Sequence, residues 1–247
     1  MQNNKLKIGL IGYGKMGKTI EKLALKRGHE IIMRISSSNV LEMNINQLDS
    51  VDVAIEFTTP ESAPNNLRIL AQHGVSTVCG STAWLDYYKE ICQLYKDNNT
   101  SFLYASNFSV GVNITFAVNE FLASIMNGFP SYNVSMLESH HLEKKDAPSG
   151  TAVTLAEQII NNLDYLDKWH NSSSKEKNSL PIESIREVDI KGLHTVKYTS
   201  EIDEITLKHE AFSREGFALG AIMAAEFING KKDIYKMSDV ISLKKHQ

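Results

Sequence analysis

Near its start the chain contains the run Lys7-Ile8-Gly9-Leu10-Ile11-Gly12-Tyr13-Gly14-Lys15-Met16-Gly17. The run places the pattern G-x-G-x-x-G between a short apolar segment and a segment with helical periodicity, where a strand would lead into a helix. In such a turn Gly12 makes the tight bend, Gly14 lets the backbone approach a pyrophosphate, and Gly17 lets the helix pack closely on the strand. The amino end of the helix would present N–H groups and partial positive charge to that pyrophosphate. The run therefore predicts a dinucleotide-binding unit.

Around this run, short strand-like segments alternate with helical ones as far as about residue 104. The strand-like segments are 6–11, 31–35, 51–57, 75–79 and 101–104, and the helical segments are 15–27, 60–73 and 83–97. Strands that alternate with helices pair in parallel through right-handed crossovers, so we expect an α/β fold with a Rossmann-type doubly wound parallel sheet. The crossover from Ser36 to Ser50 is rich in Ser and Asn, and its helix is predicted to be reduced or absent.

The pattern changes after Asn107. Helices are predicted at 111–127, 150–162 and 215–229, and strands at 132–139, 182–190, 193–200 and 203–212. Ile205 and Leu207 alternate with polar residues, which predicts a sheet with one face in water. The polar stretch 171–179 has few residues that could offset the cost of ordering, and it is predicted to be a mobile loop.

These patterns predict two domains. Residues 1–106, with residues 214–247 returning to them, would form the dinucleotide-binding domain. Residues 107–213 would form an α+β domain with a mixed sheet, for substrate binding and oligomerisation. Two crossings between the domains would act as hinges, and closure around both ligands would exclude water.

Composition limits the classes of function. The chain has 247 residues, 42% of them hydrophobic and 22% charged, as expected for a globular protein of one or two domains. A net charge of −3 argues against broad electrostatic capture of nucleic acid. No stretch approaches the roughly 18 apolar residues of a membrane span, and the first apolar run is too short for a signal peptide. Cys79 and Cys92 have no spacing partner for a metal site and suit a reducing compartment. We therefore expect a cytoplasmic protein with no membrane or nucleic-acid partner.

The end of the second predicted strand bears on the choice of cofactor. An acidic residue usually stands here to bind the ribose hydroxyls of NAD. This chain instead has Arg34-Ile35-Ser36-Ser37-Ser38-Asn39, without a carboxylate. The hydroxyls of Ser36 and Ser37 could bind a 2′-phosphate, which favours NADPH over NADH. Arg34 either assists them or points away from the site as a surface residue.

A second group of functional side chains lies in Glu138-Ser139-His140-His141-Leu142-Glu143-Lys144-Lys145-Asp146-Ala147-Pro148-Ser149-Gly150-Thr151-Ala152. Two imidazoles and two ammonium groups follow a strand, and Pro148-Ser149-Gly150-Thr151 then opens a helix. The N–H groups of Gly150 and Thr151, aided by the helix dipole, would bind a carboxylate. A nearby lysine adds positive charge, and a histidine that titrates near neutral pH can transfer a proton. The group predicts a small anionic substrate, most simply a dicarboxylate.

Two other interpretations of this group are a metal site and a purely structural loop. His140 and His141 are neighbours on one strand and would point to opposite faces, so they could not easily share a metal ion without a third ligand. No metal site is therefore predicted. The segment could also be a merely structural polar loop, but so many potentially functional groups before a helix start argue against that.

The chain resembles the 4-hydroxy-tetrahydrodipicolinate reductases, also called dihydrodipicolinate reductases, over nearly its whole length. The most specific match is the run from His140 to Ala152, which fits the pattern H-H-x-x-K-x-D-x-P-S-G-T-A at every fixed position. Further matches are Glu56-Phe57-Thr58, Gly80-Ser81-Thr82, Ala105-Ser106-Asn107-Phe108-Ser109-Val110-Gly111, and the spacing R-x-x-x-x-x-G-x-H from Arg186 to His194.

The resemblance implies roles for particular residues. His140 would donate the proton, and Lys144 would be a second acid that also steadies the substrate. His141, Ser149, Gly150 and Thr151 would hold the substrate at its carboxylates. The residues that would border the nicotinamide dinucleotide are Gly12, Tyr13, Gly14, Lys15, Met16, Gly17, Phe57, Thr58, Gly80, Ser81, Thr82, Ala105, Ser106, Asn107 and Phe108. The implied reaction is NADH- or NADPH-dependent reduction of a cyclic imine dicarboxylate with loss of water, in lysine and diaminopimelate biosynthesis. Family members are commonly homotetramers, which is the assembly we expect.

Three features depart from the common pattern of this family. The glycine loop is one residue shorter, the second crossover is abbreviated, and the acidic residue after the second strand is missing. They concern the preferred nucleotide more than the proton-transfer residues.

Two rival functions are another small-acid dehydrogenase, such as a semialdehyde dehydrogenase with a nucleophilic cysteine, and an NADPH-sensing regulator without turnover. A regulator would need neither His140 nor Lys144.

Overall fold

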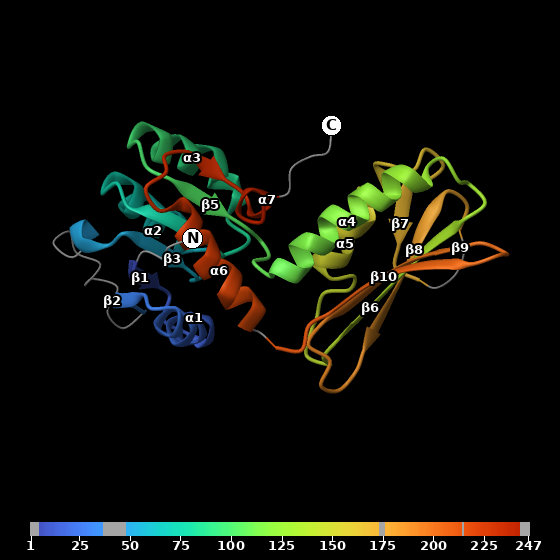
Figure 1. Ribbon diagram of the computed structural model, residues 1–247, viewed down its shortest axis with the longest axis horizontal. Helices are drawn as coiled ribbons and strands as arrows, with labels where there is room; N and C mark the ends of the chain where they lie inside the picture. The colour runs from blue at the N-terminus through green and yellow to red at the C-terminus, as the bar shows by residue number, and fades with distance from the viewer. Residues whose placement is uncertain (1–4, 37–47, 173–175, 214, 243–247) are drawn as a thin grey trace. The chain divides into compact units, whose positions relative to one another are not determined.

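The computed structural model describes residues 5–36, 48–172, 176–213 and 215–242 (Figure 1). The chain divides into two compact units, the first formed by residues 1–110 and 215–247 and the second by residues 111–214. In the described part of the chain, no helix is long and apolar enough to cross a membrane. The units are described one at a time.

The first unit is built on a six-stranded sheet in the order β11-β5-β4-β3-β1-β2, in which every pairing is parallel. Its strands are β1 (Lys7–Ile11), β2 (Glu30–Ile35), β3 (Val53–Glu56), β4 (Ser76–Cys79), β5 (Phe102–Tyr104) and β11 (Ile234–Tyr235). Strands such as β3, which is buried at every position, are expected where helices cover both faces of a parallel sheet. The predicted Rossmann-type sheet is therefore confirmed.

Helices on both faces complete this unit. They are α1 (Lys15–Lys26), α2 (Ala63–Gln72), α3 (Tyr88–Asp97), α6 (Glu215–Ile228) and α7 (Met237–Val240), with short 3-10 turns η2 (Leu48–Ser50) and η3 (Leu85–Tyr87). Apolar residues of α1 and α6 share one core cluster with β1 and β3. Residues of α2 and α3 share another with β4 and β5. The chain's last quarter thus supplies part of the core of the first unit.

The second unit holds a five-stranded mixed sheet in the order β10-β9-β6-β8-β7. Its strands are β6 (Asn133–His140), β7 (Lys168–His170), β8 (Ser179–Arg186), β9 (Leu193–Thr199) and β10 (Glu204–Glu210). β6 pairs in parallel with β8 and antiparallel with β9. The helices α4 (Val110–Met126) and α5 (Gly150–Ile160) pack on one face, where Met136, Ile182 and Val196 are buried. The second, α+β part of the predicted fold class is also confirmed.

Several predicted boundaries are wrong. The strand expected at 182–190 ends at Arg186, because a turn with Asp189 at φ 65° follows it. The helix expected from residue 60 begins at Ala63 after a turn, and the one expected from residue 83 begins as a 3-10 turn. Ser179, assigned to a mobile loop, is the first residue of β8. Residues 173–175 of that predicted loop, and residues 37–47 of the second crossover, lie outside the described residues.

Candidate active site

The predicted cofactor residues follow the carboxyl ends of adjacent parallel strands. The amides of Gly12 and Tyr13 donate to the carbonyl of Ile35, each at 2.9 Å, which ties the glycine loop to the end of β2. Phe57 N donates to Ile11 O at 2.7 Å, Gly80 N to Glu56 O at 2.9 Å, and Ala105 N to Cys79 O at 3.2 Å. The segments that start at Gly12, Ser36, Phe57, Gly80 and Ala105 therefore share one edge of the sheet, where open α/β sheets bind their ligands.

The glycine loop fits a dinucleotide. A Cβ on Gly12, whose φ is 100°, would lie 2.0 Å from Phe57 O, and one on Gly17 would lie 2.4 Å from Gly12 O. Only glycine fits at either position. A Cβ on Gly14 would meet nothing within 4 Å, and no side chain of the described residues caps α1 at this N-cap residue. The amino end of α1 thus opens toward a space that a phosphate group suits.

The other predicted cofactor residues are placed in different ways. Thr58 N donates to Ser81 Oγ at 2.7 Å, and the rings of Phe57 and Phe108 lie 5.7 Å apart. Phe108 and Ser81 are buried, whereas Lys15 is exposed. Tyr13 and Met16 pack partly on the core of the first unit. Thr82, Ala105, Ser106 and Asn107 lie in the loops after β4 and β5, and Ser37 lies outside the described residues.

Arg34 is engaged within the first unit. Its guanidinium forms an ion pair with Glu21 of α1, and the hydroxyl of Tyr13 donates to the same carboxylate. These hydrogen bonds, from Arg34 first and Tyr13 second, lower the pKa of Glu21. The guanidinium carbon also lies 6.0 Å from the centre of the Tyr13 ring. The guanidinium of Arg34 therefore lies beside Tyr13 of the glycine loop, with its charge balanced by Glu21.

In the second unit, the alternation of β6 explains how the polar cluster forms. Val134, Met136, Glu138 and His140 are all buried on the helix-covered face. Met136 pairs with Ile182 on β8 and Val196 on β9, a fully apolar row. Two residues further along, Glu138 pairs with Ser184 and His194, and His140 pairs with Arg186. Polar side chains thus replace apolar ones at the carboxyl end of the same face.

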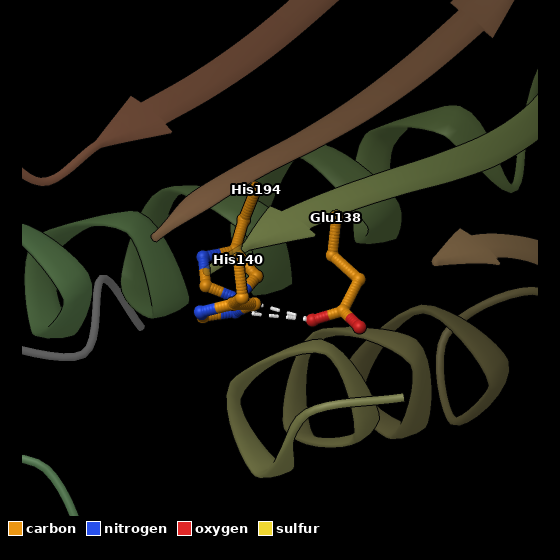
Figure 2. Close-up of side chains that lie close together, drawn as sticks. All are labelled: Glu138, His140 and His194. Atoms are coloured by element: carbon orange, nitrogen blue, oxygen red, sulfur yellow. Dashed lines mark hydrogen bonds and ion pairs between the residues drawn. The ribbon is translucent and has the colours of Figure 1, made fainter. Parts of the chain in front are cut away.

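Glu138, His140 and His194 converge in the fold (Figure 2). His140 Nε2 lies 3.1 Å from Glu138 Oε2 and 3.4 Å from His194 Nε2. His194 Nε2 lies 3.9 Å from the same carboxylate oxygen and 3.1 Å from Ser149 Oγ. Ser149 is the N-cap of α5, and its hydroxyl accepts from Ala152 N at 3.2 Å. The cluster therefore joins the end of β6 to the start of α5.

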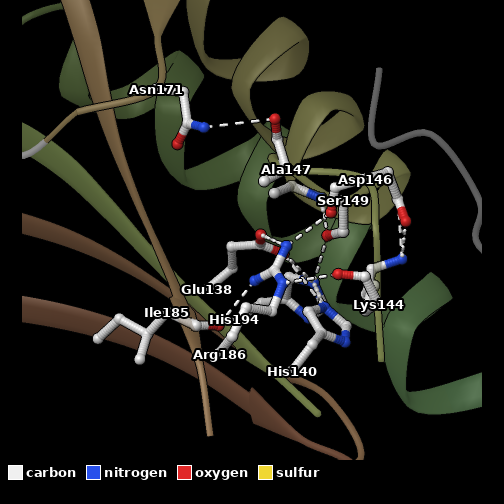
Figure 3. Close-up of polar contacts among 11 residues, drawn as sticks. Glu138, His140, Lys144, Asp146, Ala147, Ser149, Asn171, Ile185, Arg186 and His194 are labelled. Atoms are coloured by element: carbon white, nitrogen blue, oxygen red, sulfur yellow. Dashed lines mark hydrogen bonds and ion pairs between the residues drawn. The ribbon is translucent and has the colours of Figure 1, made fainter. Parts of the chain in front are cut away.

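Arg186 holds the carboxylate from the other side (Figure 3). It donates from Nη2 to Glu138 Oε1 at 3.0 Å and to Asp146 O at 2.6 Å, and from Nε to Lys144 O at 3.3 Å. Burial of Glu138 would by itself raise its pKa. Hydrogen bonds from His140, Ser149, Arg186 and Ser184 outweigh burial and hold the pKa of this carboxyl far below its usual range. Glu138 is thus a buried, ionised carboxylate.

His194 has the opposite charge preference. Burial, followed by the neighbouring His140, lowers its pKa to about 4, although Glu138 opposes this shift. At neutral pH His194 is therefore uncharged, and it can accept a hydrogen bond at Nε2 from Ser149 or from His140. Glu138 is therefore ionised and His194 is neutral. The ring of His140 lies beside a negative charge that is already present.

The remaining predicted substrate residues lie near this cluster. Lys144 Nζ is bound to both oxygens of Asp146, at 2.9 and 2.8 Å, so its charge is balanced by a carboxylate that the prediction had not considered. His141 lies 3.9 Å from the exposed Glu143, and its Nδ1 is buried without a hydrogen bond from the described residues. Gly150 and Thr151 form the first turn of α5, and a Cβ on Gly150 would meet nothing within 4 Å.

Sequence reasoning assigned no role to three members of the cluster. In the sequence, Glu138 is only the first residue of the motif, and Arg186 and His194 are only the two ends of a spacing pattern. The spacing of Glu138 and His140 by two residues on a predicted strand was a usable signal, since such residues share a face. The contribution of His194 depends on the antiparallel register of β6 and β9, which the sequence alone does not reveal.

The donor atoms of Glu138, His140 and His194 lie within 4.8 Å of one another, close enough to hold a metal ion. However, a cation is already present, because the guanidinium of Arg186 lies 3.0 Å from the second carboxylate oxygen. The hydroxyl of Ser149 also contacts the nitrogen that His194 would offer. Because Arg186 and Ser149 already contact two of the three side chains, we treat the cluster as a proton-handling network.

Comparison with known proteins identifies the family. Residues 6–108 match the family described as dihydrodipicolinate reductase, N-terminus, and residues 111–241 match its C-terminus. The chain belongs to the dihydrodipicolinate reductase family. A 4-hydroxy-tetrahydrodipicolinate reductase from Christiangramia forsetii is 42% identical to this family member over 237 residues, covering 96% of this chain and 98% of the relative. A 4-hydroxy-tetrahydrodipicolinate reductase from Methanocaldococcus jannaschii is 34% identical, covering 88% of this chain and 84% of the relative.

Solved structures of other proteins share the fold of this member of the dihydrodipicolinate reductase family. A dipicolinate-bound dihydrodipicolinate reductase from Paenisporosarcina sp. TG-14 superposes with a TM-score of 0.78 at 20% identity, covering 94% of this chain and 98% of that one. An amine dehydrogenase from Mycobacterium smegmatis gives a TM-score of 0.59 at 12% identity, covering 95% of each chain. These likenesses support the same arrangement of elements within each unit.

Proposed function

We propose that this protein reduces 4-hydroxy-tetrahydrodipicolinate to tetrahydrodipicolinate with loss of water, using NADPH or NADH. The observation that carries the proposal is the convergence of His140 with a buried carboxylate and the amino end of α5, in a chain of the dihydrodipicolinate reductase family. A proton donor beside an anion-binding helix end suits reduction of a small dicarboxylate.

The first unit would hold the nucleotide. The open amino end of α1, with Gly12, Gly14 and Gly17, would receive the pyrophosphate, and the loops after β3, β4 and β5 would border the nicotinamide. The bound nucleotide supplies a hydride to the substrate. NADPH is the proposed preference, because residues 34–39 contain no carboxylate to repel a 2′-phosphate.

The second unit would hold the substrate and supply the proton. The N–H groups at Gly150 and Thr151 would bind one carboxylate, with the helix dipole adding to the attraction. His141 and Lys144 would bind the other, and Lys144 would exchange Asp146 for the substrate when it does so. His140 would give the proton that balances the added hydride.

The cysteine environments argue against a semialdehyde dehydrogenase. Such an enzyme needs a reactive thiolate, which a lowered pKa favours. Cys79 is fully buried, and burial raises its pKa well above the usual value. Burial also raises the pKa of Cys92. Neither thiol has the environment of a nucleophile.

The test is an absorbance assay of NADPH after addition of the product mixture of dihydrodipicolinate synthase. We expect turnover by the wild-type protein, and a loss of roughly two to four powers of ten in kcat for His140→Gln with little change in cofactor affinity. His73→Gln, at the end of α2 in the first unit, removes an imidazole elsewhere and should behave like the wild type. Nucleotide binding without any turnover would favour the regulator, and an unaffected His140→Gln would remove His140 from its role.

We also propose a homotetramer in the cytoplasm, assembled on the face of the second sheet that α4 and α5 do not cover. Ser135, Leu137 and Lys197 are partly exposed there, and together with Pro181 and Glu183 they line a shallow hollow. Both cysteines are free, which suits a reducing compartment. Light scattering should give four times the 27.6 kDa chain mass. A monomeric mass would contradict the assembly.

A further inference from the structure

The polar contacts of His140 are one-sided. Its described ring contacts, to Glu138 and to His194, are both made through Nε2. The opposite edge of the ring faces Gly192, where an added Cβ would lie 3.2 Å from Cε1 and 3.5 Å from Nδ1. Because residue 192 is a glycine, it places no side chain of its own against the Nδ1 edge. Nε2 of His140 therefore contacts protein side chains, and Nδ1 borders the space next to Gly192.

The charge on Glu138 is stabilised by groups other than His140 as well. Arg186 donates to the second oxygen of the carboxylate, and the Glu138 side chain is fully buried. A buried carboxylate with a guanidinium on one oxygen stays ionised at neutral pH, so its other oxygen presents negative charge to Nε2. The charged and titratable groups around the ring are Glu138, His141, Lys144, Asp146, Arg186, His194 and, behind His194, His209. Among them Glu138 is the carboxylate in contact with the ring.

We propose that Glu138 is the positioning residue of His140: its carboxylate holds Nε2–H, stabilises the imidazolium, and directs the Nδ1 proton to the substrate. This inference rests on the proposed function, which it deepens by assigning the proton-donating nitrogen. The imidazolium gives up its Nδ1 proton, the Nε2–H bond to Glu138 is retained, and the neutral ring takes a proton from solvent before the next turnover. His194, uncharged, stays a hydrogen-bonding partner and does not compete for the charge.

Glu138→Gln tests the proposal because it keeps the shape of the side chain and removes its charge. We expect kcat to fall about 100-fold, since general acid catalysis contributes that much or more, while KM for the substrate changes less than about threefold. Without the carboxylate the imidazolium is less stable, so the pH above which kcat declines should move down by about one unit or more. Glu138→Asp keeps the charge and should keep that pH near the wild-type value. Glu120→Gln, which removes an exposed carboxylate from α4, away from the cluster, should match the wild type throughout.

A second variant separates catalysis from folding. Glu138→Gln leaves the guanidinium of Arg186 buried without its partner, which is costly. The double variant Glu138→Gln/Arg186→Met removes both charges and should regain stability in urea unfolding without regaining kcat. A return of kcat along with stability would show that Glu138 is only structural, and would overturn the proposal. So would activity that a chelator abolishes and Zn²⁺ restores, because the three side chains would then be metal ligands.

Nuclear magnetic resonance of nitrogen-15-labelled histidine gives a readout that needs no substrate. In the wild type, Nε2 of His140 should carry the proton when the ring is neutral, and the ring should lose its charge at lower pH in Glu138→Gln. If Glu138→Gln lowers the pH at which His140 loses its charge but the protein does not turn over, the proposed function is wrong and the pairing of Glu138 with His140 still holds. If the protein turns over but His140 titrates alike in both proteins, the pairing fails and the function survives.

Discussion

Nucleotide preference depends on a few side chains at the end of β2. The charge of Arg34 is balanced by Glu21, so it adds little net attraction for a phosphate. Ser36 follows directly, beside the carbonyl of Ile35 that binds the amides of the glycine loop. A carboxylate placed at residue 36 would therefore lie at the edge of the predicted ribose site.

Ser36→Asp should move preference toward NADH. The new carboxylate would accept hydrogen bonds from the ribose hydroxyls and repel a 2′-phosphate, so we expect the ratio of kcat/KM for NADPH to that for NADH to fall at least about tenfold. Ser124→Asp, which adds the same charge on the exposed side of α4, is the control. An unchanged ratio would show that the end of β2 does not face the ribose.

Individual residues differ in how far the sequence could predict them. The glycines at 12 and 17 were assigned packing roles that the structure bears out, because their spacing alone encodes the turn. His140 and Ser149 were grouped because they are close in sequence. His194 contacts both side chains. It lies 54 residues from His140 in the sequence, and only the pairing of their strands brings the two histidines together. The ion pair of Lys144 with Asp146 was missed, although both residues stand in the quoted motif, because loop geometry decides which charges meet.

At the scale of elements, α6 depends on close backbone approach. A Cβ on Gly220 would lie 1.7 Å from the carbonyl oxygen of Phe108, so no larger residue fits without movement of the helix. A Cβ on Gly216, one turn earlier, would meet only Ser109 Oγ at 3.8 Å. The same helix therefore carries one glycine that packing requires and one that it does not.

Gly220→Ala should destabilise the protein in spite of the higher helix propensity of alanine. We expect the free energy of unfolding in urea to fall by about 2 kcal/mol or more, because overpacking a tight core costs roughly 1–3 kcal/mol and α6 must shift. Gly216→Ala should leave stability unchanged or raise it by up to about 1 kcal/mol. Equal effects of the two substitutions would contradict the close approach of α6 to Phe108.

Long elements were predictable and short ones were not. The periodicity of residues 111–127 and 215–229 matches α4 and α6 within a residue or two. No pattern of residues predicts β7, β11 or α7, which have only three, two and four residues. Such short elements form because a neighbour offers hydrogen bonds, as β5 does for β11, and not because of their own pattern.

At the scale of the whole molecule, His194 should make folding sensitive to acid. Burial lowers its pKa to about 4 in the folded protein, from 6.5 for the free side chain. Between these values the unfolded chain binds a proton at this histidine and the folded chain does not, so stability falls as the pH is lowered through this window. We expect this residue to account for roughly 2.5 kcal/mol of lost unfolding free energy between pH 7.5 and 4.5.

His194→Gln should flatten this dependence. Other groups titrate in the same range, so the informative quantity is the difference in urea unfolding free energy between the variant and the wild type, measured at pH 7.5 and 4.5. The variant should lose less stability on acidification. A constant difference at both pH values would mean that His194 is not held uncharged in the fold.

The first unit is assembled from both ends of the chain, and this affects how the protein is made. α6 contributes Ala221, Ile222 and Ala225 to a core cluster whose other members include β1 and α1. The strands of the second sheet have all been synthesised by Glu210, before any of α6 exists. Although nascent proteins commonly fold from the N-terminal domain onward, here the half translated first must keep an apolar surface uncovered on the ribosome until Ile228 has emerged. Chaperones that shield such surfaces should therefore engage residues 5–104 until α6 has emerged.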